Sequence, residues 1–343
     1  MIQTLATVAR PLRPIEAAAA LGLSEGAWLT NHATAELGAR LIRLAAPAAD
    51  ILQALTPLGT VMALTRNPAC VHEKDGVYDH IEINPAMGLV VNHDIDLRLF
   101  MRHWDSAYAV EMPQADGSVR HSLQFFDRHG TAIHKIFARP VTDMAAWAAL
   151  VARFAGSFAA IHAVPRPLPP PVRPDAEIDV AALREGWSQL QDVHDFFGLL
   201  RTLKAHRQQA LRLAGAPFAR PIAPQAIRTL LEDCAARAIP IMCFVGNDAI
   251  IQIHSGPVRR VKQMGPWLNV LDPGFNLHLR VDMIVAAYAV WKPQRDAAVH
   301  SIEVFADDGS LIAQFFGERK PGRPEIPAWA ERVQALTGQG GGL

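Results

Sequence analysis

The sequence of 343 residues has little cysteine, no net charge and no long apolar run. Its three cysteines, Cys70, Cys234 and Cys243, are scattered and show no C-x-x-C or Cys/His ligand spacing. This distribution argues against a zinc site and against a disulfide framework. The 33 basic residues are balanced by 33 acidic ones. A dedicated nucleic-acid binder or a polybasic membrane protein is therefore not expected.

Signals for export and for membrane insertion are also missing. Arg10, Arg13 and Glu16 interrupt the apolar residues near the N-terminus before a continuous hydrophobic stretch forms. We therefore expect neither a signal peptide nor a membrane span, and we expect a cytoplasmic location. Half of the residues are apolar, so one large domain or two ordinary domains can bury a full core.

The motifs of common enzymes are absent too. The sequence contains no P-loop, no G-x-G-x-x-G after a strand, no G-x-S-x-G elbow and no H-E-x-x-H. Nucleotide-dependent chemistry and the common hydrolase chemistries therefore have no support. Residues 15–29, with Gly22 at a turn, weakly resemble a helix-turn-helix, but the charge balance argues against DNA as a partner.

An internal duplication is present. Residues 164–174 read VPRPLPPPVRP, and their six prolines predict a stiff, extended linker. The halves on either side of this linker match at an offset of 180 residues. Ala107-Tyr-Ala-Val110 aligns with Ala287-Tyr-Ala-Val290, and Asn67 aligns with Asn247. The chain is therefore predicted to be a tandem structural repeat.

The matching blocks predict antiparallel sheet. The turn Asp127-Arg-His-Gly130 has the glycine of a bulged hairpin, and Ala306-Asp-Asp-Gly309 is its counterpart. The predicted fold class is α+β, with a large antiparallel sheet and flanking helices in each half. Helices are expected at 15–29, 34–44, 48–55, 144–162, 180–213, 224–238 and 327–336.

These features divide the chain into four parts. We expect an N-terminal repeat at 1–163, the linker with a helical insertion at 164–223, a C-terminal repeat at 224–337 and a Gly-rich tail at 338–343. The interval 175–223 shows no counterpart in the first half, and an insertion between two repeats is a natural place for function.

His194 has an unusual setting within this interval. On one continuous helix its neighbours are Leu190, Phe197 and Gly198, so the imidazole projects from an apolar strip beside a position without a side chain. A flat apolar ligand can approach the backbone there, with the imidazole free to coordinate its centre. An ordinary half-buried histidine beside a helix-weakening glycine fits the same spacing, and the spacing alone favours that simpler interpretation.

Longer segments resemble a known family. They include Asp192-Val-His-Asp-Phe-Phe-Gly-Leu-Leu200, Arg207-Gln-Gln-Ala-Leu-Arg212, Asp94-Ile-Asp-Leu-Arg98 and Ala313-Gln-Phe-Phe-Gly317. These segments resemble the hemin-degrading factors, the cytoplasmic heme-utilisation proteins typified by HemS, ChuS and PhuS. The resemblance extends over about residues 15–336. Duplicated sheets are a feature of this family as well.

The resemblance implies a heme site. It implies His194 as the axial ligand of the heme iron, with Arg207 and Arg98 on the polar side opposite. Thirteen residues of a straight helix advance about 20 Å, so we predict a break at 203–206 that brings Arg207 and His194 to one iron. Arg102 has the same strand parity as Arg98 and is the alternative to it. Arg98 and Arg207 are the candidate catalytic residues.

The second half contributes the remaining residues that the resemblance implies. Lys292, Gln314 and Arg319 would hold the heme edge, and Phe244 would form an apolar wall. The family commonly has tyrosine where this sequence has Phe316, which removes one phenolic hydrogen bond. The residue types suit heme, a large apolar disk with two carboxylates and an iron that accepts a neutral imidazole.

Two functions follow from the resemblance. The first is a cytoplasmic heme-binding protein of bacterial heme uptake and iron acquisition, which holds heme for transfer or degradation. Its expected partners are a heme oxygenase or an inner-membrane heme importer. The alternative is a heme oxygenase-like enzyme that cleaves the porphyrin ring to release iron. Nothing in the sequence binds flavin or NAD, so its electrons would come from an external donor.

Overall fold

The computed structural model describes residues 13–295, 298–319 and 325–338. The α-helices are α1 (Pro14–Ala20), α2 (Glu25–Leu37), α3 (Ala48–Gln53), α4 (Met144–Phe154), α5 (Val180–Ser188), α6 (Asp195–Leu203), α7 (Arg207–Ala214), α8 (Ala226–Ala236) and α9 (Pro327–Gly338). The strands are β1 (Arg40–Leu44), β2 (Thr60–Arg66), β3 (Cys70–Val77), β4 (Ile81–Ile83), β5 (Gly88–Val91), β6 (Asp96–Leu99), β7 (Ser106–Pro113), β8 (Val119–Phe126), β9 (Ala132–Ala138), β10 (Ala219–Ile222), β11 (Ile241–Asn247), β12 (Ile250–Gly256), β13 (Val261–Met264), β14 (Trp267–Asp272), β15 (Phe275–Arg280), β16 (Ala286–Lys292), β17 (Val299–Phe305) and β18 (Leu311–Gly317). Four short 3₁₀ turns are η1 (Thr56–Leu58), η2 (Met101–His103), η3 (Asp175–Glu177) and η4 (Val281–Met283). The predicted tail at 338–343 lies outside the described residues except for Gly338.

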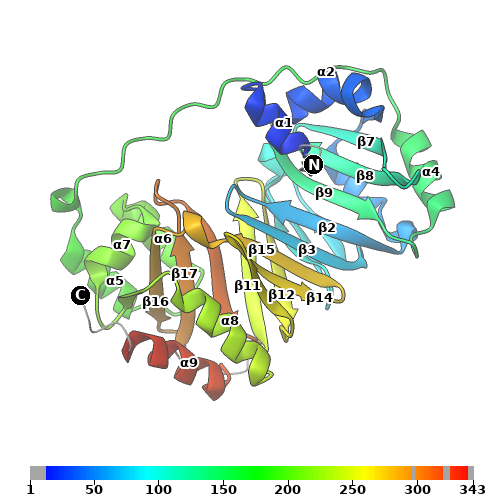
Figure 1. Cartoon of the computed structure of the whole chain (residues 1–343). Coiled ribbons are helices and arrows are strands. Elements are labelled where there is room, and N and C mark those ends of the chain that lie inside the picture. Colours follow the sequence, from blue (N-terminus) through cyan, green and yellow to red (C-terminus); the bar gives the residue numbers. More distant parts are fainter. Residues whose placement is uncertain (1–12, 296–297, 320–324, 339–343) are drawn as a thin grey trace, which may run out of the picture.

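Two antiparallel sheets of nine strands each form the centre of the molecule (Figure 1). The first sheet has the order β1-β7-β8-β9-β2-β3-β15-β14-β13, and the second has the order β10-β16-β17-β18-β11-β12-β6-β5-β4. The α+β tandem repeat with large antiparallel sheets is therefore confirmed. Each sheet also contains three strands from the other half of the chain, an exchange that the sequence does not reveal.

The exchanged strands build the cores between the sheets. Ala63 of β2 packs in one core with Leu97 and Leu99 of β6. Cys243 of β11 packs in another core with Leu277 of β15. Burying a leucine in this way contributes about 1.5–3 kcal/mol, and every pair here joins one sheet to the other. Neither repeat completes its sheet or its core alone.

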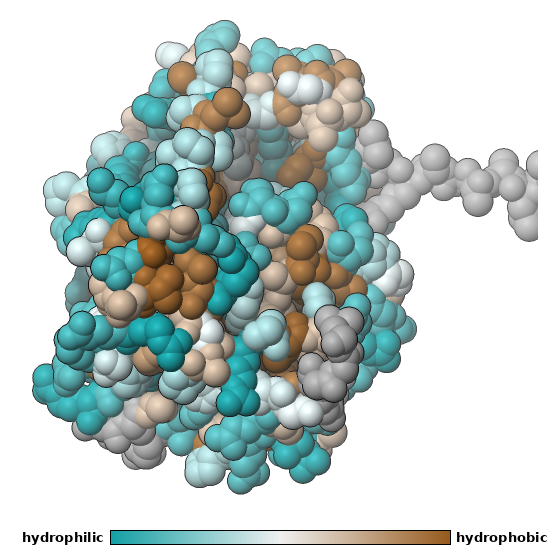
Figure 2. Space-filling model, turned by 90° about the vertical axis from the view of Figure 1, so that its left-hand side faces the viewer, coloured by the Kyte–Doolittle hydropathy of each residue, from teal (hydrophilic) through white to brown (hydrophobic). Residues whose placement is uncertain are grey.

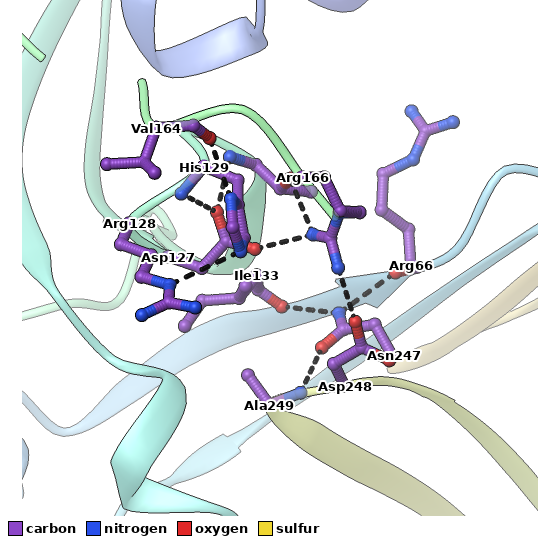
Figure 3. Close-up of polar contacts among 11 residues, drawn as sticks. Arg66, Asp127, Arg128, His129, Ile133, Val164, Arg166, Asn247, Asp248 and Ala249 are labelled. Carbon is purple, nitrogen blue, oxygen red and sulfur yellow. Dashed lines mark hydrogen bonds and ion pairs between the residues drawn. The ribbon is translucent and has the colours of Figure 1, made fainter. Parts of the chain in front are cut away.

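Asn67 and Asn247, which align in the duplication, clamp the two sheets together. The Asn67 side-chain amide donates to the carbonyls of Gly246 (3.1 Å) and Ile312 (2.8 Å) of the second repeat. The Asn247 amide donates in return to the carbonyls of Arg66 (3.0 Å) and Ile133 (2.9 Å), as Figure 3 shows. Both side chains therefore use the two donors of a primary amide to join backbones of different repeats.

Helices cover the outer faces of both sheets. Trp28 and Leu29 of α2 pack on Tyr108 and Phe126 of the first sheet, and Phe196 of α6 belongs to the cluster that covers the second. The helices α6 and α7 precede β10, which pairs with β16, as α1 and α2 precede β1, which pairs with β7. The expectation that 175–223 has no counterpart is therefore wrong for α7 and β10, which correspond to α2 and β1.

The hairpin turns and several helices agree with the sequence. Gly130 and Gly309 have φ of 71° and 77°, the left-handed conformation that their turns require. The helices predicted at 48–55, 224–238 and 327–336 correspond to α3, α8 and α9.

Other helix predictions are wrong. The helix expected at 34–44 ends at Leu37, because Gly38 adopts a left-handed C-cap and Arg40–Leu44 pairs with β7 as a strand. The helix expected at 15–29 is divided at Gly22, and Ser24 caps α2. The helix expected at 144–162 ends at Phe154. Apolar residues that follow a helix give the same sequence pattern as apolar residues within it, so the pattern did not show where these helices end.

The Pro-rich linker is extended and crosses the top of the molecule between α4 and α5 (Figure 1). Arg166 fixes its beginning by ion pairs with Asp127 of the first repeat (2.7 Å) and Asp248 of the second (2.6 Å), as Figure 3 shows. His129 Nδ1 lies 2.7 Å from the Val164 carbonyl oxygen. None of the described helices is long and apolar enough to cross a membrane.

The hydrogen bonds of Asn67 and Asn247 between the repeats, the asparagine clamp, are expected to contribute to stability. Asn247→Ala removes both donors and leaves the carbonyls of Arg66 and Ile133 without them. We expect a loss of about 1–3 kcal/mol in the free energy of unfolding, measured by urea denaturation. As a control, Asn31→Ala removes an asparagine on the surface of α2 and should change it by less than about 0.5 kcal/mol. Equal effects of the two substitutions would contradict the clamp.

Candidate functional site

One face of the second sheet carries most of the residues implied by the sequence. Across the strands, Glu303 is paired with Gln314, and Gln314 is paired with Phe244. Because side chains alternate along a strand, Phe316 lies on the same face, and its ring centroid is 5.0 Å from that of Phe244. We call this surface the site face. The opposite face, with Cys243 and Phe315, is buried in the core.

Arg98 reaches the site face through the strand exchange. It lies on β6, and its partner Ile251 of β12 is itself the partner of Gly246, two residues after Phe244. The Arg98 guanidinium forms an ion pair with Asp96, which also lies on this face. Burial raises the pKa of Asp96, against the attraction of Arg98. Arg102 lies beyond the end of β6, in the 3₁₀ turn η2, so strand parity does not extend to it.

Arg207, Lys292 and Glu303 form a buried charge cluster. Arg207 is the first residue of α7, and its guanidinium makes two hydrogen bonds to the Glu303 carboxylate, at 2.6 and 2.8 Å. Lys292 Nζ lies 2.8 Å from Glu303 Oε1. The side chains of Glu303 and Lys292 are 0% and 3% exposed, and that of Arg207 is 25% exposed. The ring of Phe196 covers both cations, 4.8 Å from Lys292 Nζ and 5.2 Å from the Arg207 guanidinium carbon.

The cluster shifts the protonation equilibria of its members. Burial alone would raise the pKa of Glu303, but the charges of Arg207 and Lys292 outweigh it and hold this pKa well below its usual range. Burial lowers the pKa of Lys292 to about 8, although Glu303 opposes the shift. The carboxylate is therefore ionised at neutral pH and neutralises one of the two cations.

His194 lies at the start of α6, in a loop that the sequence did not predict. The helical stretch expected at 180–213 breaks at Lys204–His206, as predicted, and a second time between α5 and α6. His194 is the residue before α6, and its side chain is 89% exposed. Leu190 is buried and lies outside α6, so it does not flank His194 on a helix.

Asp192 holds the His194 ring in one orientation. Its Oδ1 lies 2.5 Å from His194 Nδ1 and accepts a bond from the His194 backbone N–H at 2.8 Å. The backbone hydrogen bond is the main reason why the pKa of Asp192 is lowered. Among the residues that the structure describes, His194 Nε2 has no hydrogen-bond partner. This arrangement favours the tautomer with an open lone pair on Nε2.

An open apolar surface continues from His194 along α6. Phe197 is 69% exposed, and a Cβ added to Gly198 would meet nothing within 4 Å. The side of the molecule that carries α5–α7 shows apolar patches within a polar surface (Figure 2). Gly198 therefore leaves the backbone of α6 open, although His194 precedes this helix and the helix is shorter than expected.

Arg319 lies just beyond β18 and carries an unpaired donor. Its Nη1 donates to Gln294 Oε1 at 2.9 Å, but its buried Nε has no hydrogen-bond partner among residues 13–295, 298–319 and 325–338. Burial lowers the pKa of Arg319, and both Glu325 and Asp192 oppose the shift. The electrostatic effect of Asp192 shows that Arg319 lies near the loop that holds His194.

Sequence reasoning missed three residues of the site. Glu303 was overlooked, although an acid between Ser301 and Phe305 on a predicted buried strand is a detectable signal. Asp192 was seen as part of a motif, but its bond to His194 depends on a loop rather than on a helix. Phe196 covers the cations only because α6 is separated from α5.

The fold and the site define a class of protein. The sequence pattern of the family described as "Haemin-degrading HemS.ChuX domain" matches residues 22–154 and 204–336, once in each repeat. The chain therefore belongs to the HemS family of haemin-degrading proteins, as the resemblance in the sequence indicated.

Individual relatives match nearly the whole chain. The hemin transport protein HmuS of Yersinia pestis is 38% identical over 318 residues, which cover 92% of this chain and 90% of HmuS. The crystal structure of holo-PhuS, a heme-binding protein from Pseudomonas aeruginosa, superposes with a TM-score of 0.90 at 44% identity, covering 95% of this chain and 94% of PhuS. ChuS, described as an E. coli heme oxygenase, has a TM-score of 0.84 at 34% identity, with 94% and 95% covered.

Acid is expected to lower the free energy of unfolding, partly through protonation of Glu303. The unfolded carboxylate has a usual pKa of 4.5, above its folded value, so the unfolded chain binds more protons below that pH. The contribution of Glu303 to stability is therefore present above pH 4.5 and is lost as pH falls towards the folded pKa. In Glu303→Gln we expect the urea midpoint to fall less between about pH 5 and about pH 3 than in wild type.

Two further measurements define this prediction. At neutral pH the Glu303→Gln variant should lose about 3–5 kcal/mol of stability, because two buried cations lose their partner. Glu232→Gln, on the exposed side of α8, is the control and should keep the acid dependence of wild type. An unchanged acid dependence in Glu303→Gln would show that the buried carboxylate is not ionised as described.

Proposed function

We propose that this protein binds heme on the site face and holds it for transfer during heme uptake and iron acquisition. The names of its relatives support this function, since HmuS is a hemin transport protein and PhuS is a heme-binding protein. The observation that carries the proposal is the arrangement of one sheet face. Phe244 and Phe316 lie on this face. The cation cluster lies on the same face, and the helix α6, which packs over it, is preceded by the exposed His194.

The residues present fit the chemistry of heme. A flat apolar ligand finds aromatic surface at Phe244 and Phe316, and open backbone at Gly198. The orphaned Nε of Arg319 is a buried donor that a ligand carboxylate would satisfy. His194 Nε2 offers a nitrogen ligand for a metal centre.

Each residue then has a distinct role. Bound heme supplies an iron centre that accepts an axial nitrogen ligand. His194 would provide that ligand through Nε2, while Asp192 holds Nδ1 and fixes the tautomer. Lys292 and Arg319 would attract the carboxylates, with Gln314 beside them as a neutral hydrogen-bonding group. Arg207 would supply a cation on the side of the ligand opposite His194. Arg98 would add a cation from the first repeat.

The cellular setting is part of the same proposal. A cytoplasmic protein that receives imported heme would take it from an inner-membrane importer or pass it to a heme oxygenase. The balanced charge of the whole chain agrees with a small ligand, because such a ligand needs only a few local cations.

Replacement of His194 tests the proposed iron ligand. In His194→Ala we expect the Soret band of the hemin complex to shift and hemin affinity to fall by about tenfold or more, as measured by absorbance titration. His32→Ala removes a histidine of α2 that interacts with Glu36, and serves as the control with an unchanged spectrum. Identical Soret bands for His194→Ala and wild type would refute the assignment.

A second candidate function is ring cleavage. ChuS is described as a heme oxygenase, and Arg98 lies on the site face, where a cation can assist chemistry on bound heme. A carrier makes a distinct prediction. When the hemin complex is reduced with catalase present to remove peroxide, we expect the Soret band to persist and no carbon monoxide to form. Carbon monoxide from wild type, reduced in amount by Arg98→Ala, would establish the enzyme instead.

A further inference from the structure

Arg98 of β6 is a cation with apolar neighbours on the site face. Its cross-strand partners are Ile251 of β12 and Leu89 of β5. Side chains in such pairs have Cβ atoms about 4.5–5.5 Å apart, so they are the first groups that can fix a residue of a strand. Neither partner has an acceptor for the five donors of a guanidinium. The position of Arg98 therefore depends on groups of its own strand.

Asp96, two residues earlier on β6, is the group that binds Arg98. Its carboxylate forms an ion pair with Arg98 Nη1, and the same nitrogen donates to the Leu97 carbonyl at 3.2 Å. Within residues 13–295, 298–319 and 325–338, Nε and Nη2 of Arg98 have no hydrogen-bond partner. One end of the guanidinium is thus attached to the strand, and the other two nitrogens are left for a ligand.

The ion pair lies within reach of a ligand on the site face. Asp96 is paired with Ile253 of β12, Ile253 with Phe244 of β11, and Phe244 with Gln314 of β18. The strands β11 and β6 are two strand spacings apart, about 10 Å, which a disk of the size of heme can span. The side chains of Asp96 and Arg98 are 17% and 34% exposed. The cation is therefore the more accessible member of the pair.

An arginine without an anchor has many rotamers, and a ligand that uses it must first restrict them. The ion pair with Asp96 restricts Arg98 before a ligand arrives. A cation that is already fixed acts on a bound charge without reorganisation. Asp96 has apolar cross-strand partners too, Ile253 and Val91, so no group on the neighbouring strands replaces either charge in the pair.

We propose that Asp96 is a positioning residue for Arg98, which holds one guanidinium nitrogen and presents the other two to the ligand on the side opposite His194. The inference rests on the proposed function for the identity of the ligand. It gives Asp96 an indirect role, because Asp96 acts through Arg98 and not by contact with the ligand. Replacement of Asp96 should therefore affect bound heme only while Arg98 is present.

The first test uses the protein without a ligand. NMR relaxation of isotope-labelled arginine measures how rigid the Arg98 Nε–H is, and its signal is assigned by its loss in Arg98→Ala. We expect its order parameter to fall by about a third or more in Asp96→Ala. Asp282→Ala is the matched control, because Arg280 and Asp282 also form an ion pair between residues two apart. This substitution should leave the order parameter of Arg98 unchanged.

The second test uses the hemin complex, reduced under carbon monoxide. The stretching frequency of bound carbon monoxide reports the electric field opposite the axial ligand, because a nearby positive charge weakens the carbon–oxygen bond. We expect one narrow band in wild type and a shift to higher frequency in Arg98→Ala. Asp96→Ala should shift the band in the same direction and broaden it. Asp96→Glu keeps a carboxylate and should restore most of the wild-type band.

A double variant separates positioning from a direct effect of the carboxylate charge. In the Arg98→Ala background, Asp96→Ala should cause no further shift of the band, although it causes one when Arg98 is present. A direct field of the carboxylate would add the same shift in both backgrounds. If Asp96→Ala fails to fold, Asp96→Asn, which keeps the shape of the side chain, replaces it in both tests.

Two results would overturn the proposal. One is an Arg98 side chain that is equally ordered with and without Asp96. The other is an equal shift of the carbon monoxide band by Asp96→Ala in the presence and in the absence of Arg98. A wild-type protein that binds no hemin would refute the proposed function together with the ligand role of Asp96. A wild type that binds hemin, with both measurements unchanged in Asp96→Ala, would refute this inference alone.

Discussion

The exchange of strands between the repeats is the constraint on which the site depends. The site face is completed by β6 of the first repeat, which pairs with β12 of the second. Arg98 can join Phe244 and Gln314 on one face only because of this pairing. The asparagine clamp holds the exchange in register, since each amide binds backbone of the other repeat. The two repeats therefore form one structural unit, and the site belongs to both.

The repeats share an architecture but differ in charge at the corresponding position. The first residue of α2 is Glu25, which forms a buried ion pair with Lys135 of β9. The first residue of α7 is Arg207, which pairs with Glu303 of β17. The first residue of the corresponding helix is therefore acidic in the first repeat and basic in the second, and each forms an ion pair with a residue of the sheet. Lys292 adds a second cation beside Glu303, at a position where the first repeat has Met112. The cluster around Glu303 therefore contains one more cation than anion.

The sequence predicted features that depend on local patterns. Turn glycines at 130 and 309, the Pro-rich linker and the internal offset all have direct signatures, and each is present in the fold. The strand exchange has no such signature, because β6 carries the same alternation whichever sheet it joins. The His194 loop was missed because residues 189–194 contain no proline or glycine to mark a break. Tertiary packing of Trp187 against Phe196 sets that break instead.

The fold holds the cation cluster more rigidly than it holds His194, the proposed iron ligand. Arg207 and Lys292 are tied to a fully buried carboxylate and covered by Phe196, which itself packs on Trp187 at a centroid distance of 4.4 Å. His194 lies in an exposed loop and is held through Asp192, whose own side chain is 53% exposed. Segments with few buried contacts open at lower free energy than packed ones. The loop that carries His194 is therefore expected to open more readily than the cation cluster. If His194 is the iron ligand, as proposed, such a loop would favour transfer of the bound ligand over its retention.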